Sequence, residues 1–70
     1  MIAQINKEIG IKIRQYRVKR GFSQEDLALE ANLHRAYIGQ IERGEKNIGV
    51  NNLKKISDAL NIKISKLIED

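Results

Sequence analysis

The apolar residues of this chain recur at intervals of three and four positions, the period of an α-helix with one buried face. Strict alternation of apolar and polar residues, which marks a half-buried strand, is confined to Ile9, Ile11 and Ile13, and helical spacing surrounds that run. The chain has no Pro, so Gly and Asn must interrupt the helices. The pattern predicts an all-α bundle of five short helices over residues 6–20, 23–31, 34–43, 50–60 and 64–68.

Residues with special turn chemistry stand at the predicted boundaries. Gly21 is expected to end the first helix and Gly44 the third. Ser23 can cap the second helix, because Asp26 three residues later resembles the partner of a capping box. Asn32 tolerates the left-handed backbone conformation that a tight turn requires, so the third helix follows the second almost at once.

Length and composition exclude several classes of protein. Seventy residues make one compact domain, residues 1–70, in which residues 1–5 are expected to be a flexible N-terminal extension. The chain has one His, no Cys, and serines without a triad arrangement, so we expect no enzyme activity, metal or cofactor. No apolar run exceeds three residues, which argues against a signal peptide or a membrane span. A reducing cytoplasm is the expected location.

The charge of the chain favours an anionic partner. Thirteen Lys and Arg residues against nine Asp and Glu residues give a net charge of +4. Basic side chains predominate in residues 1–22 and 34–55, whereas residues 23–33 carry only acidic ones. Such a surface attracts polyanions, nucleic acid first, although a basic bias also occurs on surfaces that are simply solvated.

The helices predicted over residues 23–31 and 34–43 have the arrangement of a helix-turn-helix that binds DNA. In the second of them Ile38 and Ile41 define the buried side. At 100° per residue, the opposite side carries Ala36, Gly39, Gln40 and Arg43. Two small residues there would let the helix approach base edges in the major groove. Gly39 costs roughly 1 kcal/mol of helix propensity relative to Ala, so it needs a packing or approach reason.

Three runs of residues resemble the Cro/repressor-type, or XRE-like, helix-turn-helix family. They are Arg17-x3-Gly21-Phe22-Ser23-Gln24-x2-Leu27-Ala28, Tyr37-Ile38-x2-Ile41-Glu42-Arg43-Gly44 and Leu53-x2-Ile56-x3-Leu60. The resemblance spans residues 9–68, and residues 35–48 are further similar to the small controller proteins of restriction-modification systems. It implies a lambda-repressor-like DNA-binding domain and a homodimeric transcriptional regulator of an approximately palindromic DNA operator.

The resemblance and the helix geometry together assign candidate DNA contacts. The expected base-contacting residues are His34, Arg35, Ala36 and Gln40. The expected backbone-contacting residues are Ser23, Gln24, Tyr37, Arg43, Lys46 and Asn47. The resemblance also implies a buried ion pair between Arg17 and Glu42. Alternatives stay open, since Arg35 could contact phosphate, Tyr37 could serve the core alone, and His34 could be idle.

A dimer is expected because one short helix covers too few base pairs for useful discrimination. Its surface is expected to consist of Ile62, Ile64, Leu67 and Ile68 with part of the fourth helix. Ile11, Val18 and Leu29 stand where the family favours polar residues. They form either a second apolar surface, covered by residues 1–5 or by a partner, or merely scattered exposed side chains.

The chain also departs from the family at three turn or helix positions. Asn32, Gly39 and Ile48 stand where the family commonly has Gly, Ser and Pro. The second change removes a hydroxyl that often points at DNA, and the third removes a rigid turn. The alternative function is a protein-interaction module, an antitoxin or adaptor, in which the same fold binds another protein and DNA contact is secondary.

Overall fold

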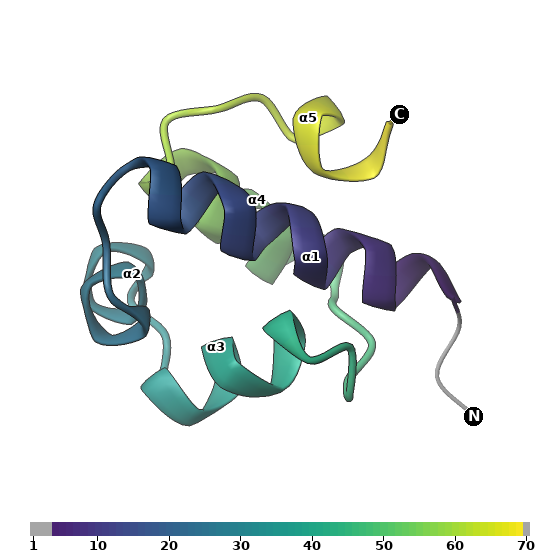
Figure 1. Ribbon diagram of the computed structural model, residues 1–70, viewed down its shortest axis with the longest axis horizontal. Coiled ribbons are helices and arrows are strands. Elements are labelled where there is room, and N and C mark those ends of the chain that lie inside the picture. The colour runs from purple at the N-terminus through teal and green to yellow at the C-terminus, as the bar shows by residue number, and fades with distance from the viewer. Residues whose placement is uncertain (1–3, 70) are drawn as a thin grey trace.

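The computed structural model describes residues 4–69 and forms five helices within them (Figure 1). They are α1 (Gln4–Lys19), α2 (Gln24–Ala31), α3 (Arg35–Glu42), α4 (Val50–Ala59) and α5 (Ser65–Ile68). No strand occurs in this part of the chain, so the all-α prediction is confirmed. Residues 4 and 5, which were expected to belong to a flexible N-terminal extension, are part of α1. Residues 1–3 of that expected extension lie outside the described range.

Side-chain and backbone caps define the ends of α2. The Ser23 hydroxyl accepts a hydrogen bond from the Asp26 amide at 3.0 Å, and the Ser23 amide donates to Asp26 Oδ2 at 2.9 Å. This reciprocal pair is the predicted capping box. Asn32 ends the helix with a φ of 57° in the left-handed region, as expected. The amide of Leu33 then donates to the Ala28 carbonyl at 2.8 Å, which directs the chain into α3.

The helices enclose a core of aliphatic side chains. Figure 1 shows α1 crossing the molecule with α3 on one side and α5 on the other, while α4 lies behind it. α1 packs against α3 and α5, and α2 packs against α3 and α4. The largest completely buried side chains are Ile13, Leu27, Ile38, Ile41, Ile56 and Leu67. As a result, α3 is held between α1 and α2 through its buried side.

The backbone of α3 comes very close to that of α1 at Gly10. A Cβ atom at this position would lie 2.8 Å from the carbonyl oxygen of Glu42 and nearer still to that of Ile41. Only a residue without a side chain allows this approach. Gly10 therefore sets the distance between α1 and the C-terminal end of α3.

Membrane-spanning helices and clusters of metal-ligating side chains are both absent from residues 4–69. No helix in this range is both long and apolar enough to cross a membrane. Within the same range, no group of three or more His, Cys, Asp or Glu side chains could hold a metal ion.

Candidate nucleic-acid interface

The two ends of α3 are formed by different means. His34 precedes the helix in an extended conformation, with a φ of −83° and a ψ of 142°, and its side chain makes no capping hydrogen bond. At the other end, Gly44 adopts a φ of 72°, and its amide donates to the Ile41 carbonyl at 3.0 Å. The imidazole of His34 therefore does not cap the N-terminal end of α3.

The buried and exposed residues of α3 follow the helical period. Ile38 and Ile41 are buried in the core, at 0% and 1% exposure. The candidate base-contacting residues His34, Arg35 and Ala36 are exposed, and the fourth candidate, Gln40, is half-buried. Three candidates therefore gather at the N-terminal end of α3, the part of a recognition helix that contacts base edges in known helix-turn-helix complexes.

Gly39 differs from the expectation that it lies open on the outer side of α3. It is buried, because two side chains from other positions cross it. A Cβ atom there would lie 3.1 Å from Arg43 Nη1 and 3.6 Å from Gln24 Oε1. The helical period places Arg43 on the same side as Gly39, four residues away, but it could not predict that Gln24 of α2 also covers this position. Ala36 is thus the small residue that the outer side presents, and Gly39 becomes accessible only when Gln24 and Arg43 move.

Arg17 of α1 and Glu42 of α3 form a buried ion pair, as the resemblance implied. Arg17 Nε lies 2.6 Å from Glu42 Oε2, and Arg17 Nη2 donates to Oε1 at 3.1 Å. Gln24 Nε2 also donates to Glu42 Oε1 at 3.2 Å, and Arg17 Nη1 donates to the Phe22 carbonyl at 2.8 Å. Such bidentate, fully hydrogen-bonded pairing compensates for the desolvation of both charges. The pair links α1, the start of α2 and the end of α3.

Ser23 and Gln24, the DNA-backbone-contact candidates at the start of α2, also make hydrogen bonds within the protein. Ser23 is exposed and caps the helix, and it holds the pKa of Asp26 below its ordinary value, chiefly through its backbone amide and secondarily through its hydroxyl. Gln24 is half-buried and donates to Glu42. Gln24 donates only one proton of its amide group to Glu42, so the other remains available to an external acceptor.

The remaining backbone-contact candidates lie within α3 or just beyond it. Tyr37 is half-buried against the core, and its hydroxyl accepts a hydrogen bond from Asn52 Nδ2 at 3.0 Å, which leaves its own proton to donate. Arg43 is exposed and pairs with Glu45, with 2.7 Å between Nε and Oε2. This pairing raises the pKa of Arg43 and lowers that of Glu45, chiefly through their hydrogen bonds. Lys46 is exposed and free to reach a phosphate.

Sequence reasoning missed Asn6, which positions the loop after α3. Its Nδ2 donates to Asn47 Oδ1 at 2.7 Å, and its Oδ1 accepts from the Ile48 amide at 3.4 Å. Asn47 itself is exposed, so it faces solvent while being tied to α1. The signal was present, because Asn6 lies on the same buried stripe of α1 as Ile9 and Ile13. A polar residue on such a stripe needs a hydrogen-bond partner.

One residue of the expected dimer surface is misplaced. Leu67 is completely buried, because the short α5 folds back on α1 and turns this side chain into the core. Ile62 and Ile64 are half-buried against the core, and Ile68 is 45% exposed. A surface for a second copy can therefore use Ile62, Ile64 and Ile68 but not Leu67.

Three aliphatic residues that depart from the family pattern are exposed. Ile11 and Val18 lie on the outer side of α1 with 55% and 58% exposure, and Leu29 lies on α2 with 76%. Ile11 and Val18 line one shallow depression with Arg14, whereas Leu29 is not part of it. A continuous apolar surface can therefore include only Ile11 and Val18, whereas Leu29 is a separate exposed side chain.

Comparisons with known proteins agree with this geometry. A family model described as helix-turn-helix matches residues 13–67. The control protein C.BamHI of Bacillus amyloliquefaciens is 44% identical over 70 residues, which cover 99% of this chain and 86% of the relative. The restriction-modification controller protein C.AhdI from Aeromonas hydrophila has a TM-score of 0.87 at 37% identity, covering 89% of this chain and 94% of that chain. The controller C.Esp1396I, solved as a tetramer in complex with its natural 35 base-pair operator, has a TM-score of 0.83 at 33% identity over 87% of this chain and 80% of that chain.

Proposed function

Because this chain belongs to the helix-turn-helix family, we propose that it is a transcriptional regulator that binds a specific sequence of double-stranded DNA as a homodimer. The relatives narrow the proposal, since C.BamHI is named a control protein and C.AhdI a restriction-modification controller. This chain is then a controller of the same kind. It acts by occupying an operator, catalyses no reaction, and works in the cytoplasm, where that DNA is found.

The observation that carries this proposal is the contrast between the two ends of α3. The buried Ile38 and Ile41 and the Glu42 ion pair hold the C-terminal part of the helix to the protein. The N-terminal part presents Arg35 and Ala36 to solvent. A guanidinium fork can donate two hydrogen bonds to O6 and N7 of a guanine, and an Ala methyl can contact the methyl group of a thymine. α3 therefore combines a fixed position with free side chains that distinguish bases.

Basic and hydroxyl groups around α3 can contact the DNA backbone. Ser23 lies at the start of α2, and Arg43 and Lys46 follow α3, so donors flank the helix at both ends. Contacts to phosphate fix the orientation of a recognition helix without carrying sequence information. Arg43 must exchange its exposed ion pair with Glu45 for such a contact, and exposed pairs of this kind contribute little stability.

The dimer follows from the dimensions of one protomer. α3 has eight residues, so it is roughly 12 Å long and spans roughly four base pairs. The protomer measures 29 × 24 × 20 Å. Two protomers side by side can therefore place their α3 helices about 34 Å apart, the separation of adjacent major grooves on one face of DNA. The apolar residues available for this contact are Ile62, Ile64 and Ile68.

Selection of bound sequences from a random duplex library tests the proposal directly. We expect one motif with two related half-sites whose centres are about one helical turn apart. Arg35→Ala should weaken binding to this motif by about 1–3 kcal/mol and relax the preference at one base pair in each half-site. Arg43→Ala is the matched control, because it should weaken binding to all duplexes alike. If no motif is enriched at low salt and neither variant matters, the protein-interaction alternative replaces this proposal.

A further inference from the structure

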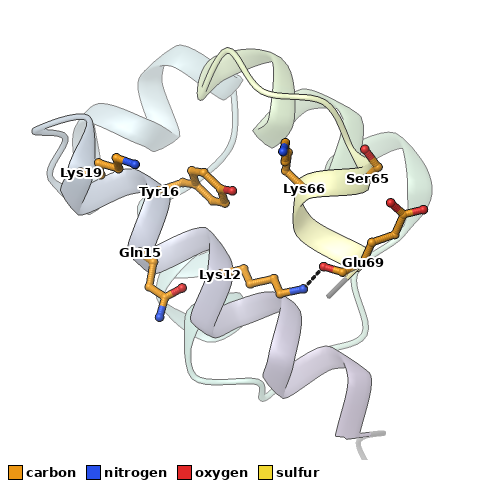
Figure 2. Close-up of a pocket in the computed structure, with 7 residues that line it drawn as sticks. All are labelled: Lys12, Gln15, Tyr16, Lys19, Ser65, Lys66 and Glu69. Carbon is orange, nitrogen blue, oxygen red and sulfur yellow. Dashed lines mark hydrogen bonds between the residues drawn. The ribbon is translucent and has the colours of Figure 1, made fainter.

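A cleft of about 460 Å³ lies between α1 and α5 (Figure 2). Figure 1 shows α5 and α3 on opposite sides of α1, so this cleft is separated from the candidate DNA-binding surface by the α1 helix. Its volume is within the range of roughly 300–1,000 Å³ that is usual for small-molecule sites. Its lining includes Lys12, Tyr16 and Lys19 from α1 and Ser65, Lys66 and Glu69 from the C-terminal segment. Ile68, the exposed apolar residue of α5, does not line it.

The cleft has an excess of positive charge. Three ammonium groups line it against one carboxylate, that of Glu69. Lys12 Nζ donates a hydrogen bond to the backbone carbonyl of Glu69, which joins the two walls at one end (Figure 2). Within residues 4–69 the salt bridges are Arg17–Glu42, Arg43–Glu45 and Lys54–Asp58, and none of them involves a lysine of the cleft. Neighbouring positive charges that have no salt-bridge partner favour an anionic ligand.

The polar groups of the cleft match a phosphate better than a single carboxylate. Lysine ammonium groups supply several donors each, and the hydroxyls of Tyr16 and Ser65 can supply two more. With Glu69 counted, the three lysines leave an excess of two positive charges, of which a monocarboxylate compensates only one, whereas a phosphate or diphosphate carries two or more charges and several acceptor oxygens. The half-buried ring of Tyr16 adds an apolar wall for the remainder of such a molecule. We propose that the cleft between α1 and α5 binds a small molecule that carries a phosphate or diphosphate group.

Titration of the full-length chain with sodium pyrophosphate, followed by two-dimensional amide NMR, tests this proposal. At about 50 mM salt, where screening is moderate, the largest shifts are expected at residues 12, 16, 19, 65 and 66. Lys66→Gln should weaken pyrophosphate binding about tenfold, the effect expected when one charge-assisted hydrogen bond is lost. Lys19→Gln should act in the same direction, and the amide spectrum of each variant reports whether its fold is retained.

Lys63→Gln is the matched control. Lys63 is exposed and precedes α5 by two residues, but it does not line the cleft, so its replacement removes the same charge from the same region. If Lys63→Gln weakens binding as much as Lys66→Gln, the attraction is only that of a basic surface and the proposal fails. It also fails if pyrophosphate shifts amides throughout the chain without a preference for the cleft.

A short DNA duplex provides the last arm of the test, because DNA also offers phosphate groups. We expect the duplex to shift amides of α3 and to leave the pyrophosphate-dependent shifts of the cleft in place, since α1 separates the two surfaces. If the duplex shifts the cleft residues and displaces pyrophosphate, the natural ligand of the cleft is the DNA backbone and the small-molecule proposal is overturned. Pyrophosphate binding is measured without DNA, so failure of operator binding leaves its result interpretable.

Discussion

Replacement of Gly10 by Ala should destabilise the protein although Ala is the better helix former. The substitution gains about 1 kcal/mol of helix propensity. The new Cβ, however, would lie 2.8 Å from the Glu42 carbonyl oxygen and closer to that of Ile41, where ordinary contacts begin at 3.4 Å. Both atoms belong to the backbone, so α1 and α3 must separate. Overpacking costs typically 1–3 kcal/mol, and here we expect the upper end. The net loss is about 2 kcal/mol, or roughly 8–16 °C in melting temperature for a domain of this size.

Gly39→Ala is the control for this experiment, because Gly39 is also a glycine inside a helix. Its Cβ would meet Arg43 Nη1 at 3.1 Å, and the Arg43 side chain is 58% exposed and can move away. We therefore expect a gain of up to about 1 kcal/mol from helix propensity. Thermal unfolding followed by circular dichroism measures both variants. If Gly10→Ala melts at or above the temperature of the unsubstituted protein, the close approach of α1 and α3 does not constrain the fold as argued.

Three further outcomes follow from the same structure. Glu42→Ala leaves Arg17 buried without its carboxylate and should lower the free energy of unfolding by about 3 kcal/mol or more in urea titrations, whereas unchanged stability would mean that water replaces the pair at no cost. Because Ser23 lowers the pKa of Asp26 below 3.8, the stabilisation is present above that unfolded-state value and disappears as the pH falls through the lower folded-state value. Asp26→Asn should therefore reduce the dependence of the melting temperature on pH in the acid range, and an unaltered profile would contradict this assignment. A dimer that neutralises roughly 6–10 phosphates should lose about 10³–10⁵ in operator affinity between about 50 and 200 mM salt, and a nearly flat response would speak against the phosphate contacts.

Features that depend on near neighbours in the chain could be predicted from the sequence. The capping box of Ser23 and Asp26 and the left-handed Asn32 are local, because the interacting atoms are at most a few residues apart. The burial of Ile38 and Ile41 also follows from spacing along one helix. For this reason the five helices and the exposed N-terminal end of α3 agree with expectation, and boundaries differ by only one or two residues at most ends.

The tertiary structure decided which side chains from other elements reach α3 and what α5 packs against. Gly39 lies on the outer side of its helix by period, yet Gln24 of α2 reaches across and covers it together with Arg43 at the end of α3 itself. Leu67 was expected on a dimer surface, but α5 packs on α1 and buries it.

The contacts between α1 and the end of α3 also belong to the tertiary structure. Asn6 reaches Asn47 across 41 positions of sequence, and the close approach at Gly10 joins residues more than 30 positions apart. The chain by itself determined its helices, its turns and the residues that α3 can offer to DNA, since short-range backbone and capping energies dictate these. The position of α3 and the cover over it depended on contacts between distant segments, which arise only when the helices pack together.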